Sequence, residues 1–301
     1  PPIAVFEMLM PAYISVVQEL VTLTDRERTP IQTETCIGGL SFLLAIARAQ
    51  GELNSKLTTL MVARRQGIIK IAQTPEIMRF LLYGVESTTR IIRKNAVCTL
   101  SYMSSAGVDV IHVIVNSGVL ETFSQIICQM RTDAVTLRHI LRIFYLLSRY
   151  NSVYVQAMDR DNIIEKLCSL ASGRRVTRLV YSELEYVLLT LTRISMVTDV
   201  EPIAWATFTH KLCGTYALPT ALSNGLQRVI QAGDTLTMND IIKAFSALLA
   251  AGRETNVVTM KQIQEYDTLS LFTQIEHNAD SESELYNNVS ALLKTHFAEY
   301  C

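Results

Sequence analysis

Apolar residues recur along this chain at spacings of three and four, the period of an α-helix that buries one face. The clearest run is Thr88–Ser105, with apolar positions at Ile91, Ile92, Ala96, Val97, Leu100 and Met103. A shorter run, Val108–Val115, ends at Gly118, where glycine can take the left-handed conformation that stops a helix. Runs over Val119–Met130 and Val135–Tyr150 follow. The pattern predicts successive helices, and no strand-like alternation competes with it.

The junction between a short helix and its successor recurs along the chain. A residue tolerant of the left-handed conformation precedes an apolar helix start at Gly67, Gly118, Asn162, Gly225 and Asp267, with spacings of 51, 44, 63 and 42 residues. Two of these spacings match the ~40–47 residues of common two- or three-helix repeats. We therefore expect tandem helical repeats, with loop insertions in the second and fourth.

Long helices also recur, one for each repeat. They are predicted over Ile31–Ala49, Thr88–Ser105, Val135–Tyr150, Arg175–Met196, Met238–Ala251 and Ser283–Tyr300. Pro30 fits the first turn of a helix and marks the start of the first of them. The segment Val197–Gly225 is the least regular, and we expect one extra helix there, Ile203–Leu212, followed by a loop.

The long helices resemble the third helix of armadillo repeats, which commonly ends in Leu-Ser-Asn-Ile-Ala. Leu100-Ser101-Tyr102-Met103-Ser104 and Leu191-Thr192-Arg193-Ile194-Ser195 carry the resemblance, and HEAT repeats fit almost as well. It implies an all-α, right-handed α-solenoid of about six armadillo- or HEAT-like repeats. The single domain would span residues 1–301, with units at approximately 1–56, 57–107, 108–151, 152–197, 198–253 and 254–301.

In the import-receptor branch of the armadillo family, columns of asparagine and tryptophan on these helices bind basic localisation peptides. Here the asparagine column reads Phe42, Tyr102, Leu146, Arg193 and Ala247, and the tryptophan column reads Gly38, Cys98, Arg142, Leu189 and Lys243. Neither array is present, and arginines would repel a basic peptide. The resemblance therefore implies a partner-binding groove but argues against nuclear-import cargo.

Charge is unevenly distributed along the chain. Thr88–Arg193 holds 13 Lys/Arg and 8 Asp/Glu, whereas residues 254–301 hold 2 Lys/Arg and 8 Asp/Glu. Several basic residues fall early on the predicted long helices: Arg90, Arg93, Lys94, Arg138, Arg142, Arg174, Arg175 and Arg178. Such a strip suits an acidic extended peptide or a helix with acidic flanks. The predicted groove residues are Phe42, Arg93, Lys94, Tyr102, Arg138, Arg142, Arg193 and Lys243, and an ordinary solvated face is the alternative.

Motifs of catalysis and of metal or cofactor binding do not occur in the sequence. The five histidines are scattered, and there is no phosphate-binding glycine loop and no nucleophile elbow. The six cysteines form no C-x-x-C pair, which is typical of core thiols in a reducing compartment. We expect neither an enzyme nor a metal or cofactor site.

Composition and net charge argue against a membrane-spanning protein and a nonspecific nucleic-acid-binding protein. We find no run of the ~18–20 apolar residues that a membrane helix needs. The net charge of −1 argues against nonspecific nucleic-acid binding. We expect a non-enzymatic interaction scaffold or adaptor that binds a protein or peptide, as part of a multi-protein complex. It would be cytoplasmic, with nuclear or cytoskeletal association as alternatives. A divergent nuclear-import adaptor and a nucleic-acid-binding helical repeat remain the competing functions.

Overall fold

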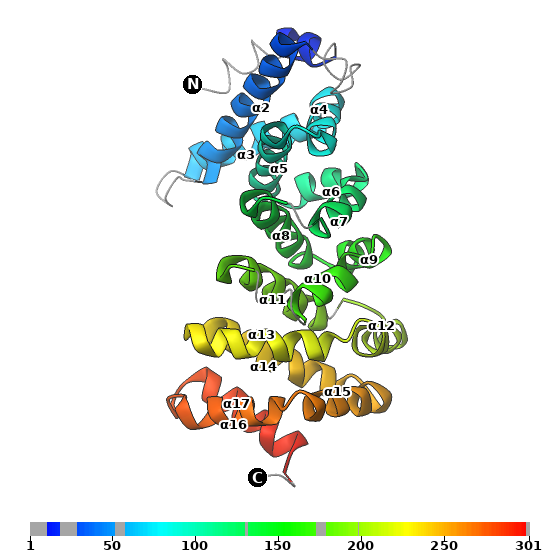
Figure 1. The fold of residues 1–301 in the computed structure, drawn as a ribbon, viewed down its shortest axis with the longest axis vertical. Coiled ribbons are helices and arrows are strands. Elements are labelled where there is room, and N and C mark those ends of the chain that lie inside the picture. Colours follow the sequence, from blue (N-terminus) through cyan, green and yellow to red (C-terminus); the bar gives the residue numbers. More distant parts are fainter. Residues whose placement is uncertain are drawn as a thin grey trace. The chain divides into compact units, whose positions relative to one another are not determined.

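The computed structural model describes residues 11–18, 29–51, 58–129, 132–172, 179–197 and 199–298 (Figure 1). All regular secondary structure in these ranges is helical. The chain divides into two compact units, residues 1–146 and 147–301, which are described in turn.

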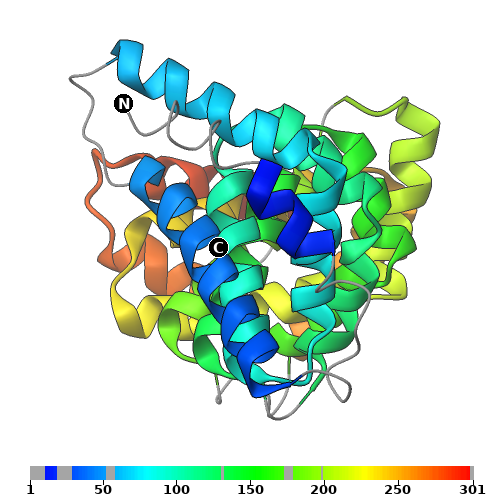
Figure 2. The same cartoon turned by 90° about the horizontal axis from the view of Figure 1, so that it is seen from above.

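The first unit begins with a helix over residues 11–18, followed by α2 (Pro30–Gly51). Two sets of three helices follow. They are α3 (Thr58–Gln73), α4 (Pro75–Glu86) and α5 (Arg90–Ser104), then α6 (Val108–Asn116), α7 (Val119–Ile127) and α8 (Ala134–Ser148). Figure 2 looks at this unit from its N-terminal side, with α2 (blue) and α3 (light blue) in the foreground. The predicted start of the first long helix at Pro30 is confirmed.

The second unit repeats the three-helix order. Its helices are α9 (Ser152–Arg160), α10 (Ile163–Ala171) and α11 (Tyr181–Ser195); α12 (Pro202–Gly214), α13 (Leu218–Ala232) and α14 (Thr235–Ala250); and α15 (Arg253–Glu265), α16 (Thr268–Asn278) and α17 (Glu284–His296). The predicted start of α11 at Arg175 falls outside the described residues, which resume at 179.

Left-handed residues separate the first two helices in four of these sets. They are Gly118 (φ 80°), Asn162 (φ 57°), Ala217 (φ 50°) and Asp267 (φ 50°). The predicted junctions at Gly67 and Gly225 are wrong, because these glycines lie inside α3 and α13. The corresponding breaks are at Thr74, before Pro75, and at Ala217. With these corrections the breaks at 74, 118, 162, 217 and 267 are 44, 44, 55 and 50 residues apart.

Gly225 serves packing rather than a turn. A Cβ at this position would clash with the fully buried side chain of Leu188, so glycine allows α13 to approach α11 closely. Gly84 has the same role in α4, since a Cβ there would lie 2.8 Å from the Cβ of Ala96 on α5. Both positions have ordinary helical backbones, and small size is what they require.

The segment 197–225 is more regular than its sequence suggests. The predicted extra helix Ile203–Leu212 is confirmed as α12, but the predicted loop after it is wrong, because α13 begins at Leu218. Much of the N-terminal half of α12 is exposed although it is apolar, with Ile203 exposed and Trp205 and Phe208 half-buried.

Aromatic and aliphatic side chains fill the core of each unit. Phe123 and Phe144 meet edge-on in the first unit, with ring centroids 6.3 Å apart. In the second unit Phe245, Phe272 and Phe297 form a chain of edge-on contacts at 5.2 and 6.3 Å. All five rings are fully buried. Each contributes roughly 2–3 kcal/mol to stability through burial alone.

The helix α2 corrects the expectation about apolar length. Its segment Pro30–Arg48 is long and apolar enough to cross a membrane, by length and composition. The helices α6 and α7, which are bent by 81° at their junction, pass the same test only if they are taken as one span. In the first unit, however, α2 packs against α5, and Cys36, Leu40, Leu43 and Ala47 are buried at helical spacing. Burial along one face is the pattern of a helix that packs on one side, and 22% of this segment is buried.

Candidate functional site

The candidate site is one side of the three long helices α2, α5 and α8 in the first unit, which follow one another in Figure 1. Positions four residues apart lie on the same side of a helix. We define three columns of equivalent residues there. The charged column is Glu34, Lys94 and Arg138, and the middle column is Gly38, Cys98 and Arg142. The aromatic column is Phe42 and Tyr102, with Leu146 at the equivalent position of α8. Together they form the long-helix face.

Two equivalent hydrogen bonds fix the register of these columns. Asn95 on α5 donates through Nδ2 to the Ser41 hydroxyl on α2 at 3.0 Å. His139 on α8 takes the place of Asn95, and its Nδ1 lies 3.0 Å from the hydroxyl of Ser101 on α5. Because each serine directly precedes its aromatic-column residue, both helix pairs share one register.

Arg142 is the most strongly connected residue of the face. One terminal nitrogen donates to the Ser101 carbonyl at 2.7 Å and to its hydroxyl at 3.0 Å. The other donates to the Ser105 hydroxyl at 2.6 Å. The guanidinium carbon lies 5.5 Å from the centroid of the Tyr102 ring, within the range of a cation–π interaction. Arg142, predicted as a groove residue, therefore also ties α8 to α5.

His139 completes this cluster. Its ring centroid is 5.4 Å from that of Tyr102. Burial, followed by the positive charges of Arg142 and Arg138, together lower its pKa from the ordinary 6.5 to about 4. The imidazole is therefore neutral at pH 7 and can share a hydrogen bond with Ser101.

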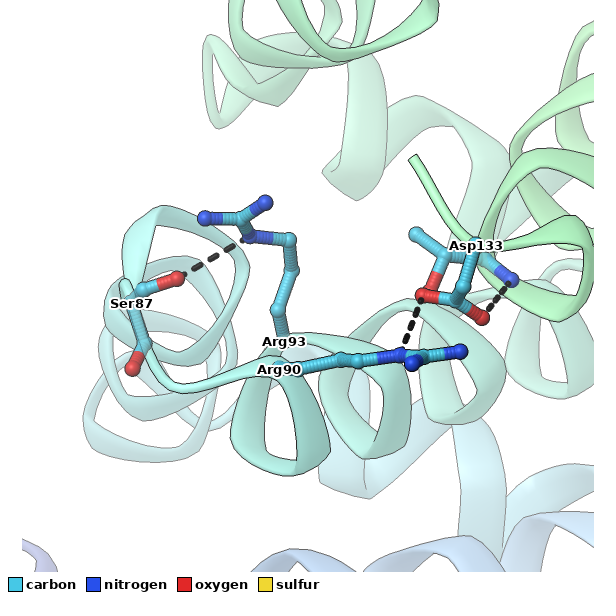
Figure 3. Close-up of polar contacts among 5 residues, drawn as sticks. Ser87, Arg90, Arg93 and Asp133 are labelled. Atoms are coloured by element: carbon cyan, nitrogen blue, oxygen red, sulfur yellow. Dashed lines mark hydrogen bonds and ion pairs between the residues drawn. The ribbon is translucent and has the colours of Figure 1, made fainter. Parts of the chain in front are cut away.

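Arg90 and Arg93 are held at the N-terminal edge of α5 (Figure 3). The Nε atom of Arg93 donates to the Ser87 carbonyl at the end of α4, at 3.0 Å. Arg93 was predicted to contact a partner, but this bond keeps its guanidinium at α4. The Nε atom of Arg90 lies 3.8 Å from Oδ2 of Asp133, the residue before α8.

Asp133 caps the first turn of α8. It accepts hydrogen bonds from the amide of Thr136 at 3.0 Å and from the Thr136 hydroxyl at 2.7 Å. Burial acts to raise the pKa of Asp133, but these bonds and the charge of Arg90 outweigh it, so the pKa is lowered. Asp234 makes the same pair of bonds to Thr237 at the start of α14. This Asp-x-x-Thr capping signal is visible in the sequence, although the groove prediction did not use it.

The eight predicted groove residues are distributed over both units. Phe42, Arg93, Lys94, Tyr102, Arg138 and Arg142 belong to α2, α5 and α8 of the first unit. Arg193 is exposed on α11 of the second unit. Lys243 is on α14, and its Nζ atom lies 2.6 Å from Oε1 of Glu284 on α17. The basic residues Arg174, Arg175 and Arg178 lie outside the described residues. The sequence prediction missed Ser101, Ser105 and His139, since only the packed helices show their contacts.

In the part of the chain that the structure describes, no group of three or more His, Cys, Asp or Glu side chains is placed to hold a metal ion. Of the described cysteines, Cys128 is exposed and the other four are buried, and burial raises the pKa of the Cys98 and Cys213 thiols to about 11. These thiols stay protonated at neutral pH, and protonated thiols are poor nucleophiles and poor metal ligands.

Comparison with known proteins identifies the fold. No known protein family and no curated protein matches the sequence. Among solved structures, computationally designed armadillo repeat proteins for modular peptide recognition match with a TM-score of 0.67 and 13% identity, over 93% of this chain and 98% of theirs. A designed armadillo repeat protein in complex with the peptide (KR)4 matches with a TM-score of 0.65 and 14% identity, over 94% and 98%. The chain has an armadillo-type fold.

The armadillo-type fold confirms the predicted fold class and the resemblance stated from the long helices. In this fold α5 and α8 are third helices of successive repeats, as Leu100-Ser101-Tyr102 had indicated. The division into six units stays a prediction. So does the assignment of the eight groove residues to partner binding.

Proposed function

We propose that this chain is a non-enzymatic interaction scaffold that binds an extended segment of a partner protein on its long-helix face. The observation that carries the proposal is the common register of the three columns, set by Asn95–Ser41 and His139–Ser101 at 3.0 Å each. Equivalent side chains then repeat at the spacing of packed helices, about 8–10 Å. A segment lying across α2, α5 and α8 would meet equivalent helix positions at regular intervals.

The charge of the face favours an acidic segment. Lys94 is half-buried, Arg138 is exposed and Arg142 is half-buried beside Tyr102. A peptide like (KR)4, which accompanies one of the designed armadillo proteins, would bring like charges to these three residues. Charge complementarity sets both specificity and association rate, so we place an acidic segment in this site.

The wider role that we propose is that of an adaptor within a multi-protein complex in the cytoplasm. Buried thiols at Cys98, Cys168 and Cys213 support a reducing compartment. The designed armadillo proteins are described as recognising peptides, which supports a peptide or protein as the partner.

The test is a selection of short random peptides against the purified chain, followed by affinity measurements on the selected peptides. We expect acidic binders that compete with one another and lose affinity when Tyr102→Ala and Arg138→Glu are combined. Circular dichroism would confirm that the variant stays folded. Binders that ignore both substitutions would place the site elsewhere. Binding to DNA or RNA with a steep loss of affinity at higher salt would favour the nucleic-acid alternative.

A further inference from the structure

The long-helix face has different chemistry on its two sides. We infer that the partner segment alternates acidic and apolar residues, with its carboxylates on Lys94 and Arg138 and its apolar side chains on Phe42 and Tyr102. This inference rests on the proposed function and specifies the partner of the same site.

The spacing of the columns matches the geometry of an extended chain. Four residues of α-helix rise about 6 Å, so the charged and aromatic columns lie on either side of the middle column at equal distances. Successive side chains of an extended segment point in opposite directions. A segment whose backbone follows the middle column therefore directs every second side chain to the cations and the others to the aromatic rings.

The middle column differs in accessibility from helix to helix. A Cβ added to Gly38 on α2 would have no atom within 4 Å, so this position is open. Cys98 on α5 is small and only 5% exposed. Arg142 on α8 is held back by Ser101 and Ser105 and lies over the Tyr102 ring. Along this column, then, Gly38 is open, Cys98 is covered by its neighbours, and Arg142 is anchored to the neighbouring helix.

The charged column offers cations that have no carboxylate partner. In the described part of the chain, neither Lys94 nor Arg138 has an ion-pair partner, whereas Arg90 is near Asp133. Exposed aliphatic side chains border the same side, since Ile91 is 43% and Val135 is 48% exposed. Apolar neighbours lower the local dielectric constant and so strengthen an ion pair formed there.

The aromatic column provides apolar contact area on the other side. Phe42 is 41% exposed, and its ring centroid lies 6.1 Å from that of Tyr13. Tyr102 is half-buried between Arg142 and His139. Half-exposed aromatic rings give large contact area at low conformational cost, which suits aliphatic side chains of a partner.

The register along the segment follows from the same dimensions. Two residues of extended chain advance about 6.6–6.8 Å, whereas packed helices are about 8–10 Å apart. The long, flexible side chains of Lys94 and Arg138 can bridge this difference. On α2 the charged column holds the exposed carboxylate of Glu34, so the segment carries no acidic residue at that point.

The experiment measures fluorescence anisotropy of three labelled peptides with the intact chain. Each holds two repeats, of Glu-Leu, Lys-Leu or Glu-Ser, flanked by Gly-Ser so that no further charged residue meets Glu34. The matched variants are the double change Lys94→Glu with Arg138→Glu, and Arg79→Glu at an exposed position of α4 as control. We expect the native chain and the control to bind Glu-Leu roughly tenfold more tightly than either other peptide. The double variant should reverse the order of Glu-Leu and Lys-Leu.

The outcomes separate this inference from the proposed function. Equal affinity for Glu-Leu and Glu-Ser, or an unchanged preference in the double variant, would overturn the alternation while leaving a peptide site in place. If no repeat peptide binds but random selection yields Tyr102-dependent binders, the inference fails and the proposed function stands. If neither approach yields a binder, both fail. Circular dichroism and thermal melting of each variant would exclude loss of fold as the cause.

Discussion

His139 is kept neutral in the folded chain, and this has a consequence for stability. Its pKa is lowered from the ordinary 6.5 to about 4, by burial first and then by the two arginines. Between these values the unfolded chain binds a proton that the folded chain does not. The free energy of unfolding therefore decreases as the pH falls from 6.5 towards 4, and this contribution is constant above 6.5.

We predict that His139→Gln removes this part of the pH dependence. Urea unfolding at pH 7 and pH 5 should show that the native chain loses more stability on acidification than the variant. The difference should be at most about 2 kcal/mol, and smaller because the ring is partly exposed to screening water. Glutamine keeps a group that can hydrogen-bond to Ser101. Equal losses in both proteins would mean that His139 titrates normally.

Arg142 should prove more important for stability than its exposed neighbour Arg138. Arg142→Lys loses the forked contact with Ser101 and Ser105 while keeping the charge. We expect a loss of about 1–2 kcal/mol in the free energy of unfolding, against a change of less than about 0.5 kcal/mol for Arg138→Lys. Chemical denaturation of both variants measures this difference, and similar values would show that the contacts of Arg142 add nothing to stability.

Among the helices, glycines of different roles respond oppositely to the same substitution. Gly38 in α2 has open space around its missing Cβ, so Gly38→Ala should stabilise the chain by up to about 1 kcal/mol through helix propensity. Gly225 in α13 faces the buried Leu188, so Gly225→Ala should destabilise it by about 1–3 kcal/mol. Thermal melting of the two variants should move in opposite directions. A stabilising Gly225→Ala would mean that α13 and α11 can separate at little cost.

These two roles of glycine explain where sequence reasoning succeeded and failed. Gly118 was correctly placed at a helix junction, and the helices on both sides were predicted to within a few residues. Gly225 was misplaced as a junction because a sequence does not distinguish a left-handed turn from a close contact, and Gly67 likewise lies inside a helix. The true junction at Ala217 carries no glycine or asparagine signal, so nothing in its residue type could have indicated it.

The candidate site was predictable to a similar extent. Aligning the long helices on Leu-Ser placed Phe42 and Tyr102 in one column, and the Asn95–Ser41 and His139–Ser101 bonds agree with that register. The contacts of Arg142 and Arg93 could not be predicted, because they depend on how neighbouring helices pack.

At the scale of the whole chain, repeated helices interact mainly with their neighbours, so damage should remain local. Phe245→Ala would remove the edge-on contact with Phe272 in the second unit and cost about 3–5 kcal/mol. We predict faster amide hydrogen exchange in α14, α16 and α17, with α2–α5 unchanged. Hydrogen exchange read by mass spectrometry tests this expectation. A uniform increase along the chain would show instead that all repeats unfold as one.

The charged column gives the long-helix face a direction. Read from α2 to α8 it runs Glu34, Lys94, Arg138, and this order is not the same in reverse. A peptide segment also has a direction, from amino to carboxyl end. A segment with carboxylates at one end only can satisfy both cations and avoid Glu34 in one orientation but not when turned round. Whatever is attached to each end of such a segment would therefore always emerge at the same end of the face.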